Sequence, residues 1–295
     1  MRFGAIDIGS NAVRLLIADV IETEDDLIIK KLSLTRVPIR LGSSVFETGS
    51  ISSSKAKRLV KTMKAFRYLL DVYDVKGFRA CATSAMREAS NSDEVRAKVK
   101  EYANVDIEVI DGRTEADLIF STFKTQKLDP SGTYLYIDVG GGSTEITLLK
   151  NGKRVHARSF KIGTVRILKS NIKPEIWTDM EEWLADITKD EKDMVAIGTG
   201  GNINRLFKMS KLNYGELMGL DELKEMHAYI QTLSFNERIT QLNFRPDRAD
   251  VIVPAGEIFC RVMGVAKIKH ISVPKIGLSD GIVLYLYRQH MKELV

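Results

Sequence analysis

Short apolar runs that end in glycine-bearing turns alternate along the chain with segments of helical periodicity. The apolar runs at 3–8 and 134–139 read as buried strands, and each is followed, after a small-residue turn, by a second apolar run, at 13–20 and 145–149. Over 52–73, apolar residues fall on one face at the spacing of a helix. Strands that alternate with helices in each half of the chain predict an α/β fold.

The remaining elements follow from the same patterns. We expect further strands over 77–83, 105–110, 153–160 and 268–273, and one that starts at 195. We expect helices over 84–88, 93–102, 175–188 and 220–233. Two more helices are expected, one from 112 to about Phe123 and one after Gly281. Pro254 lacks an N–H, so a helix over 249–264 is expected to be broken or kinked. Periodicity stops over 127–132, which predicts one domain of residues 1–127 and another of residues 128–295.

Two of the strand–turn–strand units have nearly the same sequence. One reads Ile6-Asp7-Ile8-Gly9-Ser10-Asn11 and the other Ile137-Asp138-Val139-Gly140-Gly141-Gly142-Ser143-Thr144. Glycine and small polar residues allow successive backbone N–H groups to turn toward one anion. One such turn in each half predicts a duplicated fold that binds a phosphate from both sides.

Other glycine-rich phosphate motifs do not fit these turns. The dinucleotide pattern GxGxxG fails because Glu145 stands where its last glycine belongs, and the Walker pattern GxxxxGK[ST] is absent from the sequence. Both motifs also require a helix after the turn, whereas a strand is predicted after each of these. A tight hairpin without a ligand is the alternative for either turn alone; the matched pair, with a third glycine-rich turn at 198–202, favours a phosphate site.

Carboxylates stand beside both turns. Asp7 and Asp138 end apolar strands, where an ionised side chain is costly unless it is paired or binds a metal. Mg²⁺ binds a few carboxylates and retains water, which suits this pair; a hydrogen bond that tightens the turn is the alternative. Glu145 can join Asp138 at the metal or pair with a lysine. Glu115 stands in the first turn of its helix, where the helix dipole alone favours an acid.

Composition places the chain among globular cytoplasmic proteins. Its 295 residues suffice for two domains, 44% of them are hydrophobic, 28% are charged, and the net charge is +5. No apolar run reaches the ~18 residues needed to span a membrane, no secretory signal opens the sequence, and Cys81 and Cys260 lack CxxC spacing. The mild positive charge suits an anionic ligand, and no motif supports nucleic-acid binding.

The turns belong to a larger set of motifs that resembles the exopolyphosphatase/guanosine pentaphosphate phosphohydrolase family. These motifs occur in the family's order: Asp7-Ile8-Gly9-Ser10-Asn11 with Val13-Arg14-Leu15, Ala82-Thr83-Ser84-Ala85-Met86-Arg87-Glu88-Ala89, Gly112-Arg113-Thr114-Glu115-Ala116, Asp138-Val139-Gly140-Gly141-Gly142-Ser143-Thr144-Glu145, and Ser159-Phe160-Lys161-Ile162-Gly163-Thr164-Val165-Arg166. The resemblance implies the actin-like ATPase superfamily fold, an α/β fold of two ribonuclease H-like domains around a central cleft. It also implies Mg²⁺-dependent release of terminal phosphate from polyphosphate or pppGpp, with Mn²⁺ as a substitute.

The resemblance further implies roles for individual residues. Glu115 matches the family's general base, although by itself it is better explained as a helix-start carboxylate. Asp138 and Glu145 match the family's catalytic metal and water ligands, and Asp7 matches the carboxylate of the first phosphate turn, so these three form the expected metal site. The expected phosphate-binding residues are Gly9, Ser10, Asn11, Arg14, Ser84, Arg87, Gly140, Gly141, Gly142, Ser143 and Thr144.

We therefore predict a cytoplasmic phosphoanhydride hydrolase that acts on polyphosphate or on guanosine penta- or tetraphosphate and forms a homodimer. The alternatives are an ATP-dependent small-molecule kinase of the same superfamily, with the turn at 198–202 contacting adenosine, and a non-catalytic sensor of polyphosphate or (p)ppGpp. Because the sequence stops after the two core domains, we expect the helical C-terminal domains of long family members to be absent and short polyphosphates to be preferred. Neither a nucleic acid nor a membrane is an expected partner.

Overall fold

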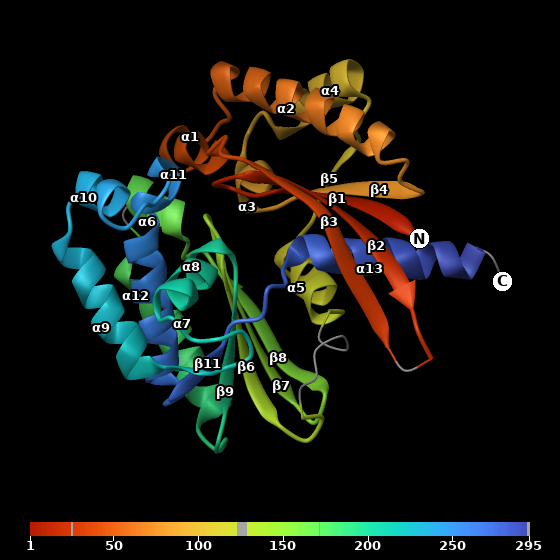
Figure 1. Ribbon diagram of the computed structural model, residues 1–295. Helices are drawn as coiled ribbons and strands as arrows, with labels where there is room; N and C mark the ends of the chain where they lie inside the picture. Colours follow the sequence, from red (N-terminus) through yellow and green to blue (C-terminus); the bar gives the residue numbers. More distant parts are fainter. Residues whose placement is uncertain (25, 123–128, 171, 294–295) are drawn as a thin grey trace. The chain divides into compact units, whose positions relative to one another are not determined.

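The structure is a computed structural model that describes residues 1–24, 26–122, 129–170 and 172–293. The chain forms two compact units, coloured along the sequence in Figure 1. Unit 1 comprises Met1–Leu128 together with Ile276–Val295, and unit 2 comprises Asp129–Lys275. Unit 2 is therefore inserted into unit 1. Within the described ranges, no helix is both long and apolar enough to cross a membrane.

Unit 1 is built on a mixed sheet of five strands in the order β3-β2-β1-β4-β5. The strands are β1 (Arg2–Ile8), β2 (Val13–Glu22), β3 (Leu27–Val37), β4 (Gly77–Ala82) and β5 (Ile107–Val109). The first three form an antiparallel meander, and β4 and β5 continue parallel to β1. The sequence patterns predicted β1, β2, β4 and β5 but gave no strand at β3, an edge strand in which no residue is fully buried.

Helices cover both faces of this sheet. They are α1 (Leu41–Thr48), α2 (Ser53–Val72), α3 (Ser84–Glu88), α4 (Ser92–Ala103), α5 (Gly112–Phe120) and α13 (Leu278–Glu293). Figure 1 shows α2 and α4 together on one face and α5 with α13 on the other. Successive side chains of β1 point to opposite faces of the sheet, which explains why helices pack on both faces. Ile6 and Ile8 join the core beneath α2, while Phe3 contacts Tyr287 of α13.

The position of α13 differs from the predicted division of the chain. The sequence boundary assigned all of 128–295 to one domain, whereas α13 packs against β1, β2, β4 and α5 of unit 1. The physical reason is the apolar underside of the unit 1 sheet, which α13 covers with Ile282, Val283 and Tyr287. Phe123 and residues 127 and 128, which bear on the predicted helix end and linker, lie outside the described residues.

Unit 2 repeats the same sheet. Its strand order is β10-β11-β9-β6-β7-β8, with β6 (Thr133–Val139), β7 (Thr144–Lys150), β8 (Lys153–Phe160), β9 (Val195–Thr199), β10 (Met218–Gly219) and β11 (His270–Ser272). The series β8-β7-β6-β9-β11 has the order and strand directions of β3-β2-β1-β4-β5. The predicted duplication is therefore confirmed at the level of topology.

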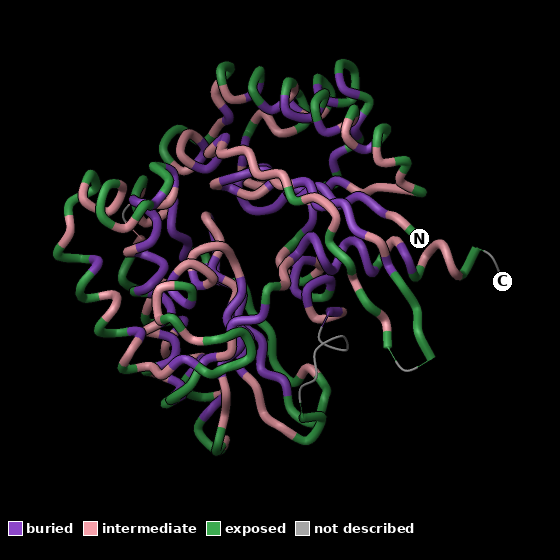
Figure 2. The backbone as a smooth tube through the Cα atoms, viewed as in Figure 1, coloured by how far each residue is buried: buried purple, intermediate pink, exposed green. Residues whose placement is uncertain are grey.

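The helices of unit 2 surround α12 (Ile252–Val265), which is the most buried of them in Figure 2. The others are α6 (Thr164–Lys169), α7 (Pro174–Thr188), α8 (Gly201–Met209), α9 (Leu220–Thr232), α10 (Phe235–Thr240) and α11 (Pro246–Ala249). The predicted break at Pro254 is wrong. Pro254 stands in the first turn of α12, where its missing N–H has no partner to lose, and the helix continues without interruption.

Candidate active site

The two similar hairpins close in the same way. In unit 1 the Gly9 N–H donates to the Ala12 carbonyl at 3.1 Å, and in unit 2 the Gly140 N–H donates to the Ser143 carbonyl at 2.9 Å. The flanking cross-strand pairs also correspond, because Ile8 faces Val13 as Val139 faces Thr144. The resemblance in sequence is thus a resemblance in backbone geometry.

A neighbouring segment of unit 1 fixes the turn at 9–12. The Gly42 N–H donates to the Ser10 carbonyl at 2.8 Å, and the Arg40 N–H donates to the Asn11 carbonyl at 2.9 Å. The buried hydroxyls of Ser10 and Ser84 share a hydrogen bond of 2.9 Å, which joins the turn to the start of α3. The structure therefore brings together Ser10, Asn11 and Ser84, three of the predicted phosphate-binding residues.

Asp7 and Arg14 face each other directly across the first hairpin. The Arg14 Nη1 lies 2.6 Å from the Asp7 Oδ2, and the Asp7 side chain is 8% exposed while that of Arg14 is 33% exposed. A buried carboxylate is stable when it is paired with a cation. Arg14 thus neutralises Asp7 and still has guanidinium surface open to solvent for a phosphate.

The turn at 140–143 is held from its carbonyl side by the start of α6. The Val165 N–H donates to the Gly141 carbonyl at 2.8 Å, and the Arg166 Nε donates to the Gly142 carbonyl at 2.7 Å. Gly163 lets the two segments approach, since a Cβ there would lie 2.5 Å from the Gly142 nitrogen.

The N–H side of the same turn is different. Within the described residues, the N–H groups of Gly141, Gly142 and Ser143 donate no hydrogen bond. Successive N–H donors in a turn whose carbonyl oxygens are already bonded form a nest for an anion. The second hairpin therefore has the chemistry of a phosphate cradle. The Thr144 hydroxyl, by contrast, is buried and donates to the Ile162 carbonyl at 2.6 Å.

Two carboxylates occupy the strand ends at this cradle. Asp138 and Glu145 are direct cross-strand partners in the β6–β7 register. Glu145 is 2% exposed, and its Oε1 accepts hydrogen bonds from Ser143 Oγ at 2.7 Å and from Ser159 Oγ at 2.8 Å. Those bonds fix one oxygen of Glu145, and they make Ser159 a site residue to which the sequence analysis gave no role.

The third glycine-rich turn also lies at Asp138. Thr199 at the end of β9 is the parallel neighbour of Asp138, and Gly200 follows with φ of +102°. A Cβ on Gly200 would lie 3.2 Å from the Asp138 Oδ1, so this position requires glycine for both its backbone angle and its neighbour. Unit 2 thus gathers the turns at 140–143 and 198–202 around one carboxylate.

Glu115 lies on α5 of unit 1 and is 8% exposed. The cap of this helix is Asp111, whose Oδ1 accepts the Thr114 N–H at 2.7 Å, and this hydrogen bond lowers the pKa of Asp111. The start of α5 therefore has its own cap, and Glu115 stands in the first turn as expected, where the helix dipole favours an acid whatever its catalytic role. Arg87 Nη1 donates to the Ile110 carbonyl at 2.6 Å, which anchors the segment leading into α5.

Together with burial, the charges of Asp7 and Glu115 both raise the pKa of the same buried thiol, that of Cys81. Cys81 on β4 is the register neighbour of Asp7, and burial raises the pKa of its thiol to about 12, with further increases from Glu108, Asp7 and Glu115 against the opposing charge of Arg79. Two predicted site carboxylates of unit 1 therefore influence one buried group. The sequence alone does not reveal this, because β1, β4 and α5 are far apart along the chain and come together only in the folded unit.

Comparison with known proteins gives the family. The model of the Ppx/GppA phosphatase family matches residues 20–290. The chain belongs to the Ppx/GppA phosphatase family. It is 24% identical to exopolyphosphatase 1 of Mycobacterium leprae, over 96% of this chain and 89% of that protein. It is 23% identical to the guanosine-5'-triphosphate,3'-diphosphate pyrophosphatase of Aliivibrio fischeri, over 95% of this chain and 58% of that protein.

A solved family structure shares the fold. The crystal structure of an exopolyphosphatase from Cytophaga hutchinsonii superposes with a TM-score of 0.86 at 25% identity, and the match covers 98% of each chain. The predicted α/β fold of two actin-like domains is confirmed. The family resemblance drawn from the motifs is confirmed as well.

Mg²⁺ is the metal that the Ppx/GppA resemblance implies. Within the described ranges of this chain, no three His, Cys, Asp or Glu side chains lie together closely enough to hold a metal ion. Asp138 and Glu145 nevertheless form a fitting pair, because Mg²⁺ is commonly bound by one or two carboxylates together with waters and substrate phosphates. Asp7 fits less well, since its Oδ2 already pairs with Arg14.

Proposed function

We propose that this protein hydrolyses terminal phosphoanhydride bonds in Mg²⁺, releasing phosphate from inorganic polyphosphate or from a guanosine penta- or tetraphosphate. The observation that carries the proposal is the second hairpin, where N–H donors without a partner among the described residues adjoin the cross-strand acids Asp138 and Glu145. The names of the Mycobacterium leprae and Aliivibrio fischeri relatives support the two substrate classes.

Each group of residues has a role in this proposal. The N–H groups of residues 141–143 would bind oxygens of the transferred phosphate and stabilise the charge that builds on them. Mg²⁺ held by Asp138 and Glu145 would offset charge and polarise the phosphate. Glu115 would take the proton from the attacking water, and Arg14 and Arg87 would neutralise phosphate oxygens.

Phosphate release tests the proposal directly. Purified protein is given polyphosphate, pppGpp or ATP, with and without Mg²⁺ and without any acceptor molecule. We expect Mg²⁺-dependent phosphate release from at least one of the first two. Turnover only after an acceptor is added would support a kinase, and tight binding without turnover would support a sensor; either result would overturn the proposal.

Glu115→Gln tests the assignment of the base. Loss of a general base lowers kcat by about 10²–10⁴-fold while substrate binding is retained. Glu101→Gln is a matched control, because it makes the same change at an exposed acid of α4 in the same unit. Equal kcat in the wild type and in Glu115→Gln would remove Glu115 from the mechanism.

A further inference from the structure

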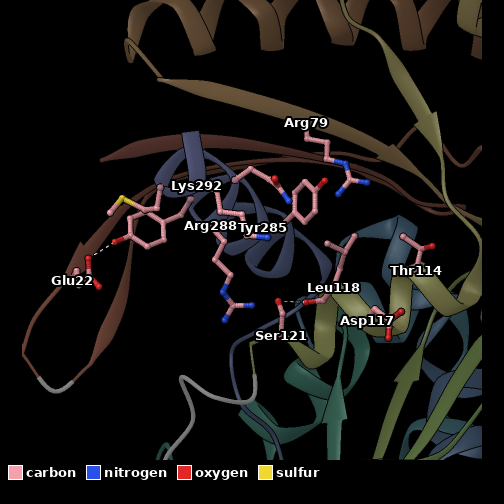
Figure 3. A pocket seen from close by; sticks show the side chains of 12 residues that line it. Glu22, Arg79, Thr114, Asp117, Leu118, Ser121, Tyr285, Arg288 and Lys292 are labelled. Carbon is pink, nitrogen blue, oxygen red and sulfur yellow. Dashed lines mark hydrogen bonds between the residues drawn. The ribbon is translucent and has the colours of Figure 1, made fainter. Parts of the chain in front are cut away.

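Unit 1 contains a cavity of about 570 Å³ that none of the predicted site residues lines. Its walls come from α5 and α13, with contributions from the end of β2 and from β4, as Figure 3 shows. Ligand pockets commonly enclose about 300–1,000 Å³, so the cavity has the size for a small molecule. The lining residues of α5 lie at i, i+3, i+4 and i+7 from Thr114 and form one face of the helix, outside which Glu115 falls.

Cationic side chains outnumber acidic ones in the lining. Arg79 enters from β4, and Arg288 and Lys292 lie one turn apart on α13. Among the described residues, Arg288 and Lys292 form no hydrogen bond or ion pair, and both are exposed. The acids in the lining are Glu22 and Asp117. The lining thus contains three cations and two acids, and one of the acids, Glu22, accepts a hydrogen bond from the Tyr287 hydroxyl at 2.6 Å.

One N–H donor group of Arg79 has no acceptor among the described residues. Its Nε and Nη2 each donate to Glu108 at 2.8 Å, whereas Nη1 is buried and has no hydrogen-bond partner in the described part of the chain. A buried donor without a partner is costly. Because the Nη1 atom has almost no accessible surface, Arg79 favours an anion in the cavity through its charge rather than through a hydrogen bond from this atom.

An aromatic and apolar surface lies beside these cations. The Arg79 Cζ lies 4.3 Å from the centroid of the Tyr285 ring, which remains 38% exposed. Leu118 and Met291 add apolar surface to the same cavity. One part of the cavity therefore suits an anion and another suits a planar or apolar group.

We propose that this cavity binds a small phosphate monoester that carries an aromatic ring. The phosphate contacts Arg288 and Lys292 near the charge of Arg79, and the ring lies on Tyr285 and Leu118. The site is separate from the residues assigned to phosphate hydrolysis, so the proposal stands whether or not the proposed function holds.

Adenosine 5'-monophosphate is a suitable probe, because it has both parts and contains no anhydride bond. Calorimetric titration of the full chain measures its affinity, with adenosine and inorganic phosphate as half-ligands. We expect saturable binding of the monophosphate that is tighter than that of either half. The double variant Arg288→Ala/Lys292→Ala should weaken it by at least about ten-fold, the loss expected for charge-assisted hydrogen bonds.

The controls make the outcome decisive. Lys57→Ala/Lys61→Ala removes two exposed cations from α2 and should bind as the wild type does. Tyr285→Leu should weaken the monophosphate but leave inorganic phosphate unchanged. Phosphate release from the proposed substrates should be unchanged in Arg288→Ala/Lys292→Ala when no monophosphate is present. The absence of saturable binding, equal affinity in the wild type and Arg288→Ala/Lys292→Ala, or adenosine binding as tightly as the monophosphate would each overturn the proposal.

Discussion

The two hairpins have the same backbone and opposite charge at one register position. In the first, the residue across from the strand-end aspartate is Arg14; in the second, it is Glu145. The first hairpin therefore contains a neutralised pair, Asp7 with Arg14. The second places two acids side by side, an arrangement that is destabilising by itself and that attracts a divalent cation. Under the proposed function both turns bind an anion, and this one register position distinguishes them: it holds an expected metal ligand, Glu145, in the second hairpin and Arg14 in the first.

The largest expected effect comes from removing the acids of the second hairpin. Glu145→Gln and Asp138→Asn should each lower kcat by at least about 10²-fold and raise the Mg²⁺ concentration needed for half-maximal activity, because each weakens an oxygen ligand. Phosphate release over a Mg²⁺ titration measures both quantities. An unchanged Mg²⁺ midpoint in both variants would mean that the ion is held elsewhere.

Changing the first hairpin should have a different signature. Arg14→Lys keeps a cation beside Asp7 but loses the guanidinium geometry, so kcat/KM should fall by about ten-fold while the Mg²⁺ midpoint stays at the wild-type value. The same titration serves as the assay. A shifted Mg²⁺ midpoint would place Asp7 at the metal, as the sequence suggested. The two hairpins would then not differ in metal binding.

Ser159→Ala tests how strongly the position of Glu145 matters. The variant removes one of two hydroxyl donors to the Glu145 Oε1, and the Mg²⁺ midpoint should rise by a few-fold, up to about ten-fold. Ser159→Thr should restore most of the affinity. Ser170→Ala is the matched control, since among the described residues that hydroxyl bonds a carbonyl of α6 and no site acid. A midpoint equal to that of the control would show that Ser143 suffices.

The smallest effect concerns Asp280, a further buried acid of unit 1. Asp280 pairs with Lys31 at 2.7 Å, yet burial, acting against that cation, raises its pKa above 3.8. The native state then holds this proton more tightly than the unfolded state. Its contribution to stability therefore declines as pH rises from below 3.8 through the raised value. Asp280→Asn lacks this decline.

Urea unfolding over a pH series measures this difference. The free energy of unfolding of the wild type relative to Asp280→Asn should fall with rising pH across that window. Parallel curves would show that Asp280 titrates normally. The result bears on the comparison of the hairpins, because it shows whether the cation paired with a buried acid of unit 1 fully offsets the cost of burying that acid.

The sequence predicted what depends on local order. Both hairpins, the duplication, most helices and the family follow from short motifs and periodicity, and they are found in the structure. The prediction at Pro254 was wrong because a proline breaks a helix in its interior but not in its first turn. The periodicity of the sequence does not show where the helix begins.

The sequence did not predict contacts that depend on register or on packing. Arg14 and Asp7 were assigned to different ligands, although the hairpin register makes them partners. Ser159 reaches Glu145 only because β8 pairs with β7, and α13 reaches unit 1 only because the sheet there has an apolar face to cover. The roles of individual site residues remain predictions for the experiments above.

The return of α13 to unit 1 has a consequence for biosynthesis. The ribosome makes β1 to α5 first, then all of unit 2, and only then the helix that covers the underside of the first sheet. Until that helix emerges, Phe3 lacks the Tyr287 ring that it contacts in the finished protein. Unit 2 can complete its core during translation, whereas one apolar face of the unit 1 sheet stays exposed until α13 is made. Chaperones bind nascent chains at exposed apolar surfaces of that kind.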